Sequence, residues 1–267
     1  MDGENNACIK CLGGKYNNID AVGCKPAPIY DPYFKTFLIN LQEYAKGLKI
    51  SFLTQNQKQT NLVQSHFGDQ VSVKRIGLWT SDMPVFDDVK ELRKKLVDKE
   101  YILYHGAPVS SKGVYHTLNL AEKCPEIRFI FPFDKSEINY PNIPSNCEFK
   151  PMTWYTGLKE SAMNARIVLV PSLWSAPIES ALVKSIMLLR AVCVVDVDTA
   201  FSSEIDNKII IKLSNNIDES SLQLRKAYNE KWKPNDDDLN IWIQKHLENN
   251  GFPVERMIKY LNNYQNA

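Results

Sequence analysis

The sequence predicts an α/β protein with a doubly wound parallel sheet, a reduced lobe before the sheet and helices after it. From about residue 70, short β-branched runs alternate with helical patterns, which is typical of βαβ units. Two runs, residues 167–170 and 192–195, are apolar at every position, as expected of strands covered by helices on both faces. After Ile217 the pattern is helical, with breaks near Pro234 and Pro253.

The expected elements follow one another in a regular order, and Pro, Gly or Ser marks most of their ends. The first 70 residues contain a Gly-, Asn- and Cys-rich segment followed by a helix pattern, a strand-like run and a second helix pattern: residues 1–32, 33–45, 49–53 and up to Phe67. Strands are then expected at residues 71–76, 101–105, 128–131, 167–170, 191–196 and 208–213. Helices are expected at residues 87–97, 112–123, 155–163 and 178–189. We divide the chain into a lobe (1–70), an α/β domain (71–250) and a terminal helix (251–267).

Composition and charge exclude several classes of protein. Lys and Arg together number 32 and Asp and Glu 31, so no overall field attracts nucleic acid or an anionic membrane surface. No apolar run reaches the roughly 18 residues of a membrane span, and residues 1–10 lack the apolar core of a secretory signal. We therefore expect a cytoplasmic protein with no nucleic-acid partner and no integral membrane segment.

Two groups of residues resemble metal sites. Cys8, Cys11 and Cys24, with His66 as a fourth ligand, have a spacing that suits zinc, although a disulfide or free thiols are also open and reduced thiols are expected. Asp196 and Asp198 form a D-x-D pattern that could hold a divalent cation, whereas a turn at the end of a strand is the simpler interpretation. No metal is assigned to either group.

The first segment with chemical potential follows the expected strand at 101–105. Residues 105–113 read HGAPVSSKG, a turn of small residues that opens a helix. Free amides, the helix dipole and the charge of Lys112 would together suit a diphosphate. A plain connection with a solvated lysine is the alternative. His105 could reach the phosphates or an acceptor, or it could simply pack in the sheet.

The second segment, residues 170–179, also leads from a buried strand into a helix. Ligands of open α/β sheets bind outside the carboxyl ends of strands, so two such loops predict a crevice between them. Glu179 stands at the helix start, where it could bind sugar or ribose hydroxyls. Its alternative role is that of an N-terminal glutamate favoured by the helix dipole.

These segments resemble the C-terminal domain of glycosyltransferase family 4, over about residues 48–215. That family carries a G-R-x(4)-K-G loop, an aromatic-x-G loop and an A-(D/R)-hydrophobic-P-S segment, followed by a helix with two glutamates seven residues apart. Residues 106–113 resemble the first, residues 149–152 the second, and residues 164–172 (NARIVLVPS) closely match the third.

The resemblance implies a Rossmann-like GT-B domain and an enzyme that moves a sugar from a nucleotide diphosphate sugar to a glycan or other hydroxyl acceptor. It also implies retention of configuration and no cofactor or metal. Lys112 and Glu179 are the expected catalytic residues. The expected donor-binding set is His105, Gly106, Lys112, Gly113, Met152, Ser175, Ala176, Pro177 and Glu179. Residues 1–70 would be a remnant of the acceptor-side domain, against which the terminal helix packs.

Departures from the family pattern keep other functions open. Ala107 stands where the family has a phosphate-binding arginine, and Ala176 and Lys184 align with the two glutamates. A non-catalytic nucleotide-sugar-binding subunit, with an acceptor-domain partner or as a homodimer, is the main alternative. A phosphate-binding α/β domain of another kind, such as one that acts on modified nucleic acid, is a third alternative, which the neutral charge balance disfavours.

Overall fold

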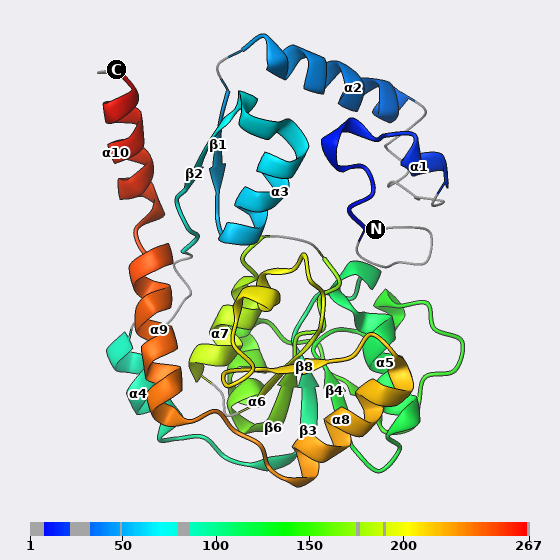
Figure 1. Ribbon diagram of the computed structural model, residues 1–267. Helices are drawn as coiled ribbons and strands as arrows, with labels where there is room; N and C mark the ends of the chain where they lie inside the picture. The colour runs from blue at the N-terminus through cyan, green and yellow to red at the C-terminus, as the bar shows by residue number, and fades with distance from the viewer. Residues whose placement is uncertain are drawn as a thin grey trace.

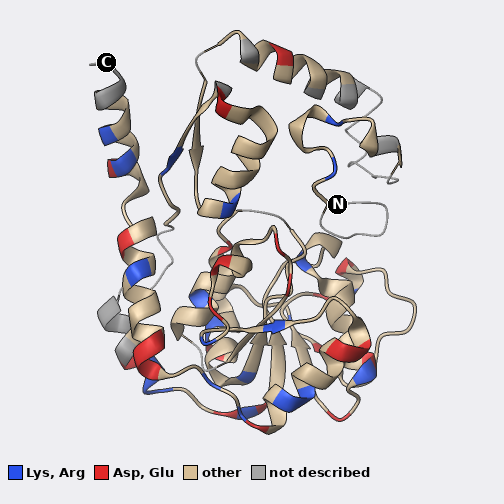
Figure 2. Cartoon of the chain, in the orientation of Figure 1, with Lys and Arg blue, Asp and Glu red and all other residues tan. Residues whose placement is uncertain are grey.

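The computed structural model describes residues 8–21, 33–48, 50–79, 86–174, 177–188 and 191–265. It has a small lobe, drawn at the top of Figure 1, and a large lobe below it. Lys and Arg segments alternate with Asp and Glu segments over the large lobe (Figure 2), in line with the net charge of +1.

The large lobe is built on a six-stranded sheet in which every pairing is parallel. The strand order is β5-β4-β3-β6-β7-β8. In chain order the strands are β3 (Lys99–Tyr104), β4 (Phe129–Phe131), β5 (Cys147–Phe149), β6 (Ala165–Leu169), β7 (Val192–Val195) and β8 (Ile211–Leu213). The order reverses between β3 and β6, because the chain first builds one half of the sheet and then the other. This confirms the predicted doubly wound α/β fold.

Helices cover both faces of this sheet, α5 and α8 on one side and α6 and α7 on the other (Figure 1). Two separate apolar clusters result: Leu103 belongs to the one with α7, and its neighbour Ile102 to the one with α5. Alternate residues of one strand thus enter opposite layers, as the apolar runs required. The helices are α4 (Phe86–Arg93), α5 (Val114–Lys123), α6 (Lys159–Asn164), α7 (Ser180–Leu188) and α8 (Ile217–Asn229), with short turns η3 (Ser110–Lys112), η4 (Lys135–Glu137), η5 (Trp154–Leu158) and η6 (Phe201–Glu204).

The small lobe has a two-stranded parallel sheet, β1 (Ser51–Thr54) with β2 (Ser72–Arg75). The remaining elements are η1 (Leu12–Gly14), α1 (Asn18–Ala21), α2 (Tyr33–Lys46), α3 (Gln57–Phe67) and η2 (Gly68–Gln70). The strand at 71–76 was expected to open the large α/β domain, and this was wrong. It pairs with β1 because α3 forms the crossover of a βαβ unit with both strands.

Two helices end the chain, α9 (Asp236–Asn250) and α10 (Pro253–Gln265). The Tyr260 hydroxyl donates to Ser51 Oγ at 2.8 Å, and Arg256 Nη1 donates to the Ile76 carbonyl at 3.0 Å, so α10 lies against the small lobe. At Gly77 (φ 84°) an added Cβ would lie 2.5 Å from Asn250 Cα. Only glycine therefore lets the chain pass between the lobes this close to α9. Within the described residues, no helix combines the length and apolarity that a membrane crossing requires.

Candidate functional site

The loop after β3 is held in shape by a tyrosine beneath it. Tyr104 is fully buried, and its hydroxyl is within hydrogen-bond distance of the carbonyls of Ala107 (2.6 Å) and Lys112 (3.0 Å). At Gly113 (φ 73°) an added Cβ would lie 2.0 Å from the Pro171 carbonyl oxygen. A glycine is therefore required where the first loop passes the second.

The loop after β6 is fixed to the first loop through its backbone. The Leu173 amide donates to the Ser111 carbonyl at 2.9 Å, and the Leu173 side chain packs on Val195, Val197 and Ala200. Both loops leave the carboxyl ends of neighbouring strands, β3 and β6. The structure thus brings together the two segments that the sequence analysis selected.

Lys112 and Glu179 meet between these loops. Lys112 Nζ lies 2.7 Å from Glu179 Oε1, with side-chain exposures of 25% and 15%. The ammonium also lies 5.4 Å from the centre of the Trp174 ring. The Glu179 carboxylate was expected to meet ligand hydroxyls, whereas here it neutralises the lysine. The partial burial of both groups makes this a stronger contact than an open surface ion pair.

A cavity of about 40 Å³ lies beside this pair, which is close to the volume of a single water molecule and too small for a diphosphate. Lys112, Glu179 and Pro177 from the predicted set line it, together with Trp174 and Ser202, which the sequence analysis missed. Ser202 lies in the turn after β7, and nothing in the local sequence distinguishes it. Ser175 and Ala176 lie outside the described residues.

His105 does not face this cavity. It is 6% exposed, its Nδ1 lies 2.9 Å from Ser185 Oγ, and its ring stacks on Trp154 with 5.4 Å between centroids. Burial, with a smaller effect of the nearby Lys184 charge, lowers the pKa of His105 to about 3. The imidazole is therefore neutral near pH 7, and this geometry matches the packed strand-end histidine that was the alternative.

Lys184, aligned with the second family glutamate, is buried on α7. Its ammonium lies 4.6 Å from the centre of the Trp154 ring, and the residue is 6% exposed. Met152 lies on the loop after β5, where its amide donates to the Pro132 carbonyl at 3.1 Å and its sulfur accepts from Ser161 Oγ at 3.3 Å. Met152 is not among the residues that line the Lys112 cavity.

The small lobe reaches the site through the turn between β1 and α3. Gln55 Oε1 accepts from the Ile178 amide at 3.0 Å, directly before α7, and the Lys58 amide donates to Glu204 Oε1 at 2.6 Å. Gln55 therefore occupies an amide at the start of α7. No sequence pattern indicates this contact, because its partners lie 123 residues apart.

The metal alternatives can be placed only in part. The Asp196 and Asp198 carbonyls accept from Asn215 Nδ2 (3.0 Å) and Ser203 Oγ (2.9 Å), the geometry of a strand-end turn. Across the described part of the chain, no three His, Cys, Asp or Glu side chains gather closely enough to hold a metal ion. Cys24 lies outside that part, and His66 Nε2 lies 2.8 Å from the Tyr16 hydroxyl.

No family model and no curated protein matches this chain, but solved structures do. Sucrose-phosphate synthase from Thermosynechococcus elongatus matches with a TM-score of 0.63 at 11% identity, over 89% of this chain and 64% of that one. HepE from Anabaena in complex with UDP matches with a TM-score of 0.61 at 10% identity, over 96% and 77%. S. aureus TarM matches with a TM-score of 0.55 at 15% identity, over 85% and 46%.

The chain thus spans less than two thirds of the synthase. At these identities the likenesses establish the fold. The protein has the Rossmann-like GT-B architecture of its glycosyltransferase neighbours.

Proposed function

We propose that this chain binds a nucleotide diphosphate sugar and transfers the sugar to a hydroxyl acceptor, with retention and without a metal. One observation carries the proposal. The two loops for which the sequence predicted a crevice meet at the carboxyl ends of β3 and β6 and hold Lys112 between them. That edge of an open α/β sheet is where ligands bind.

The contribution of the protein would be electrostatic. Breaking the bond between sugar and diphosphate leaves negative charge on the diphosphate, which Lys112 and the positive end of the α7 dipole would stabilise. The diphosphate must first take Lys112 from Glu179 and widen the cavity. Glu179 is then released to bind hydroxyls of the sugar or ribose. The proposed role of His105 is to position Trp154 and α7, since its ring contacts both.

Residues 1–70 enter the proposal as a remnant of an acceptor-side domain. The contact between Gln55 and Ile178 supports this, because it sets the small lobe over the site. The second candidate, a non-catalytic binding subunit, is favoured by Ala107 and Lys184, which replace family side chains. Such a subunit would bind the donor in the same crevice and leave it intact.

Calorimetry with UDP tests the binding step. Lys112→Met should weaken binding by roughly 1 to 3 kcal/mol, the scale of a charge-assisted contact. Glu179→Gln should strengthen it several-fold, since the lysine no longer has a competing carboxylate. Lys123→Met is the matched control, because Lys123 is half-exposed and pairs with Asp218 at the far end of α5. Equal affinity in wild type and Lys112→Met would remove the phosphate role from Lys112.

Turnover separates the two candidates. Release of UDP from a UDP-sugar at the same rate with and without EDTA would indicate a metal-independent transferase. Binding without release would favour the non-catalytic subunit. Activity lost in EDTA and restored by manganese would contradict the metal-free proposal.

A further inference from the structure

Trp174 follows an anchored residue, and its own side chain is exposed. It follows Leu173, whose amide is bonded to Ser111 and whose side chain is packed on the cluster of Val195. The indole itself is 53% exposed. The exposed indole leaves apolar area in contact with water, which a ligand could cover.

The surroundings of the ring are those of a site for a polar ligand with an apolar face. Trp174 lines the same cavity as Lys112, Glu179 and Ser202, and the Lys112 ammonium lies 5.4 Å from its ring centre. A cation, a carboxylate and a hydroxyl therefore border one flat aromatic surface. Ligand sites commonly combine such an apolar wall with a few polar groups that fix orientation.

A sugar ring matches this combination. One face of a pyranose consists of C–H bonds, and its edge carries hydroxyls. Stacking that face on indole removes apolar area from water, while the carboxylate and hydroxyl nearby accept from the edge. A diphosphate on Lys112 would place the attached sugar within reach of the indole, because the two side chains are in contact.

The geometry points to Trp174 as the stacking surface for the sugar of the donor, an inference that rests on the function proposed above. A competing role is that Trp174 only holds Lys112 through the cation–π contact. The two roles differ in what they predict. A stacking surface affects the sugar nucleotide and spares the free diphosphate, whereas a support for Lys112 affects both equally.

Calorimetry with UDP, UDP-glucose and UDP-N-acetylglucosamine on wild type, Trp174→Ala and Trp174→Phe separates these roles. Trp174→Ala should lower the affinity for the better sugar nucleotide about three- to tenfold more than that for UDP. Trp174→Phe should keep most of the difference, since a smaller flat ring remains. Tyr155→Ala is the matched control: Tyr155 is 80% exposed and lines a different groove beside α6.

Each result decides the question. An equal loss for UDP and the sugar nucleotides would show a support for Lys112 and overturn the inference. So would unchanged affinities in Trp174→Ala, or a Tyr155→Ala effect of the same size. Binding of UDP to wild type in those cases would leave the proposed function standing. If wild type bound none of the three ligands, the proposed function and this inference would both be overturned.

Discussion

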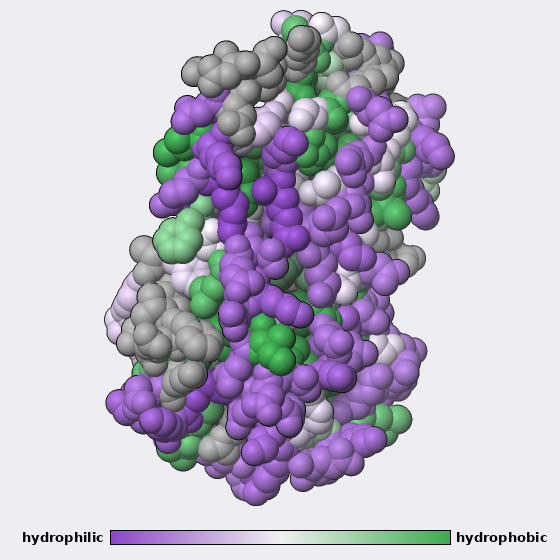
Figure 3. Space-filling view, turned by 60° about the vertical axis from the view of Figure 1, so that its left-hand side comes forward, coloured by the Kyte–Doolittle hydropathy of each residue, from purple (hydrophilic) through white to green (hydrophobic). Residues whose placement is uncertain are grey.

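The two lobes differ most in how much apolar surface they bury. In the described part of the small lobe, Tyr16 and Ala45 are the buried apolar side chains, whereas β3 alone buries four. Helix α2 instead exposes large apolar side chains, namely Phe37, Ile39, Leu41 and Tyr44. Figure 3 shows apolar patches separated by hydrophilic areas on one face of both lobes.

The two lobes are therefore stabilised in different ways. The large lobe has an apolar layer on each face of its sheet. A two-stranded sheet has too little area for this, so the small lobe depends on contacts with α10 and with the large lobe. Its open apolar side chains are where a second copy or an acceptor-binding partner would attach, which stays a prediction that light scattering tests.

The largest expected effect is a cavity in the large lobe. Leu103 in β3 is fully buried, so Leu103→Ala should lower the free energy of unfolding by about 2 to 5 kcal/mol. Leu53 in β1 is 36% exposed, and Leu53→Ala should change it by less than about 1 kcal/mol. Urea unfolding measures both. Equal losses would contradict the proposed difference between the lobes.

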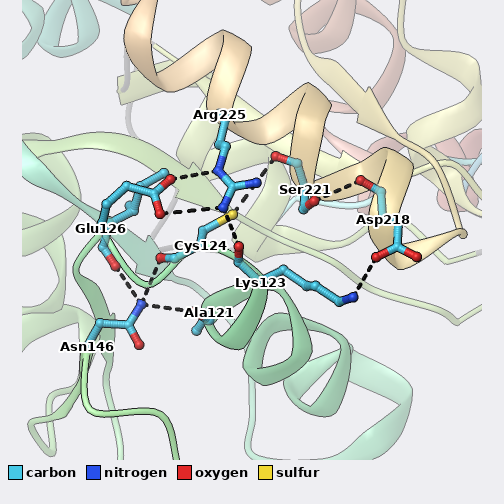
Figure 4. Close-up of polar contacts among 9 residues, drawn as sticks. Ala121, Lys123, Cys124, Glu126, Asn146, Asp218, Ser221 and Arg225 are labelled. Atoms are coloured by element: carbon cyan, nitrogen blue, oxygen red, sulfur yellow. Dashed lines mark hydrogen bonds and ion pairs between the residues drawn. The ribbon is translucent and has the colours of Figure 1, made fainter.

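The next effect concerns a side-chain amide that bonds backbone carbonyls in the large lobe (Figure 4). Asn146 Nδ2 lies 3.0, 2.9 and 2.7 Å from the carbonyl oxygens of Ala121, Cys124 and Ile127, so its two N–H groups are shared among three acceptors and close the turn between α5 and β4. Asn146→Ala leaves these carbonyls without that donor and should cost about 1 to 3 kcal/mol of stability.

The matched control for Asn146 is a neighbouring ion pair. Lys123 Nζ lies 2.6 Å from Asp218 Oδ1, and both side chains are largely exposed. Lys123→Met should therefore cost less than about 1 kcal/mol in thermal or urea unfolding. A larger loss in Lys123→Met than in Asn146→Ala would show that charge, rather than the buried carbonyls, stabilises this turn.

A smaller effect is expected from pH. Burial lowers the pKa of His116 to about 4 and lowers the pKa of His66, on the small lobe, below its usual 6.5. A lowered histidine pKa means that the unfolded state takes up the proton first. The stabilisation is thus complete above about pH 6.5 and is lost as the pH falls toward the folded pKa.

Comparing two variants isolates this contribution from carboxylates that titrate in the same range. His116→Gln should reduce the loss of unfolding free energy between pH 7 and 5 by up to about 1.4 kcal/mol per pH unit. His66→Gln should reduce it less, because His66 is less buried. Urea unfolding at several pH values gives both slopes, and a steeper change for His66 would reverse the comparison.

The smallest effect is local to the junction of the lobes. Tyr260→Phe removes the hydroxyl that donates to Ser51 and should lower the free energy of unfolding by about 0.5 to 1.5 kcal/mol. Amides of β1 and β2 should then exchange with solvent faster, whereas those of β3 and β6 should keep their rates. Faster exchange in β3 would show that the small lobe and the large lobe unfold together.

Much of the candidate site followed from sequence because its loops follow strongly patterned strands. The strand expected at 167–170 overlaps β6 (Ala165–Leu169) except for Val170, which lies in the loop, and Lys112 lies on its predicted turn. The strand β5 was not expected, and the helix expected at 155–163 begins as the π-helical turn η5 before it continues as α6. β5 reads Cys-Glu-Phe, with a charge at its centre, whereas the equally short β4 reads Phe-Ile-Phe and is apolar throughout. The irregular backbone of η5 depends on Gly157 at φ 110°.

The alternation of strands and helices and the doubly wound sheet can be predicted from sequence, because apolar periodicity is local and burial on both faces leaves continuous apolar runs. The pairing of β2 with β1 is established only in the folded chain, since a four-residue strand does not specify its partner. Packing also decided that Lys112 meets Glu179, 67 residues away, and that His105 turns into the core. Those outcomes depend on which loops the sheet brings together, and a local sequence pattern does not specify contacts between residues far apart in the chain.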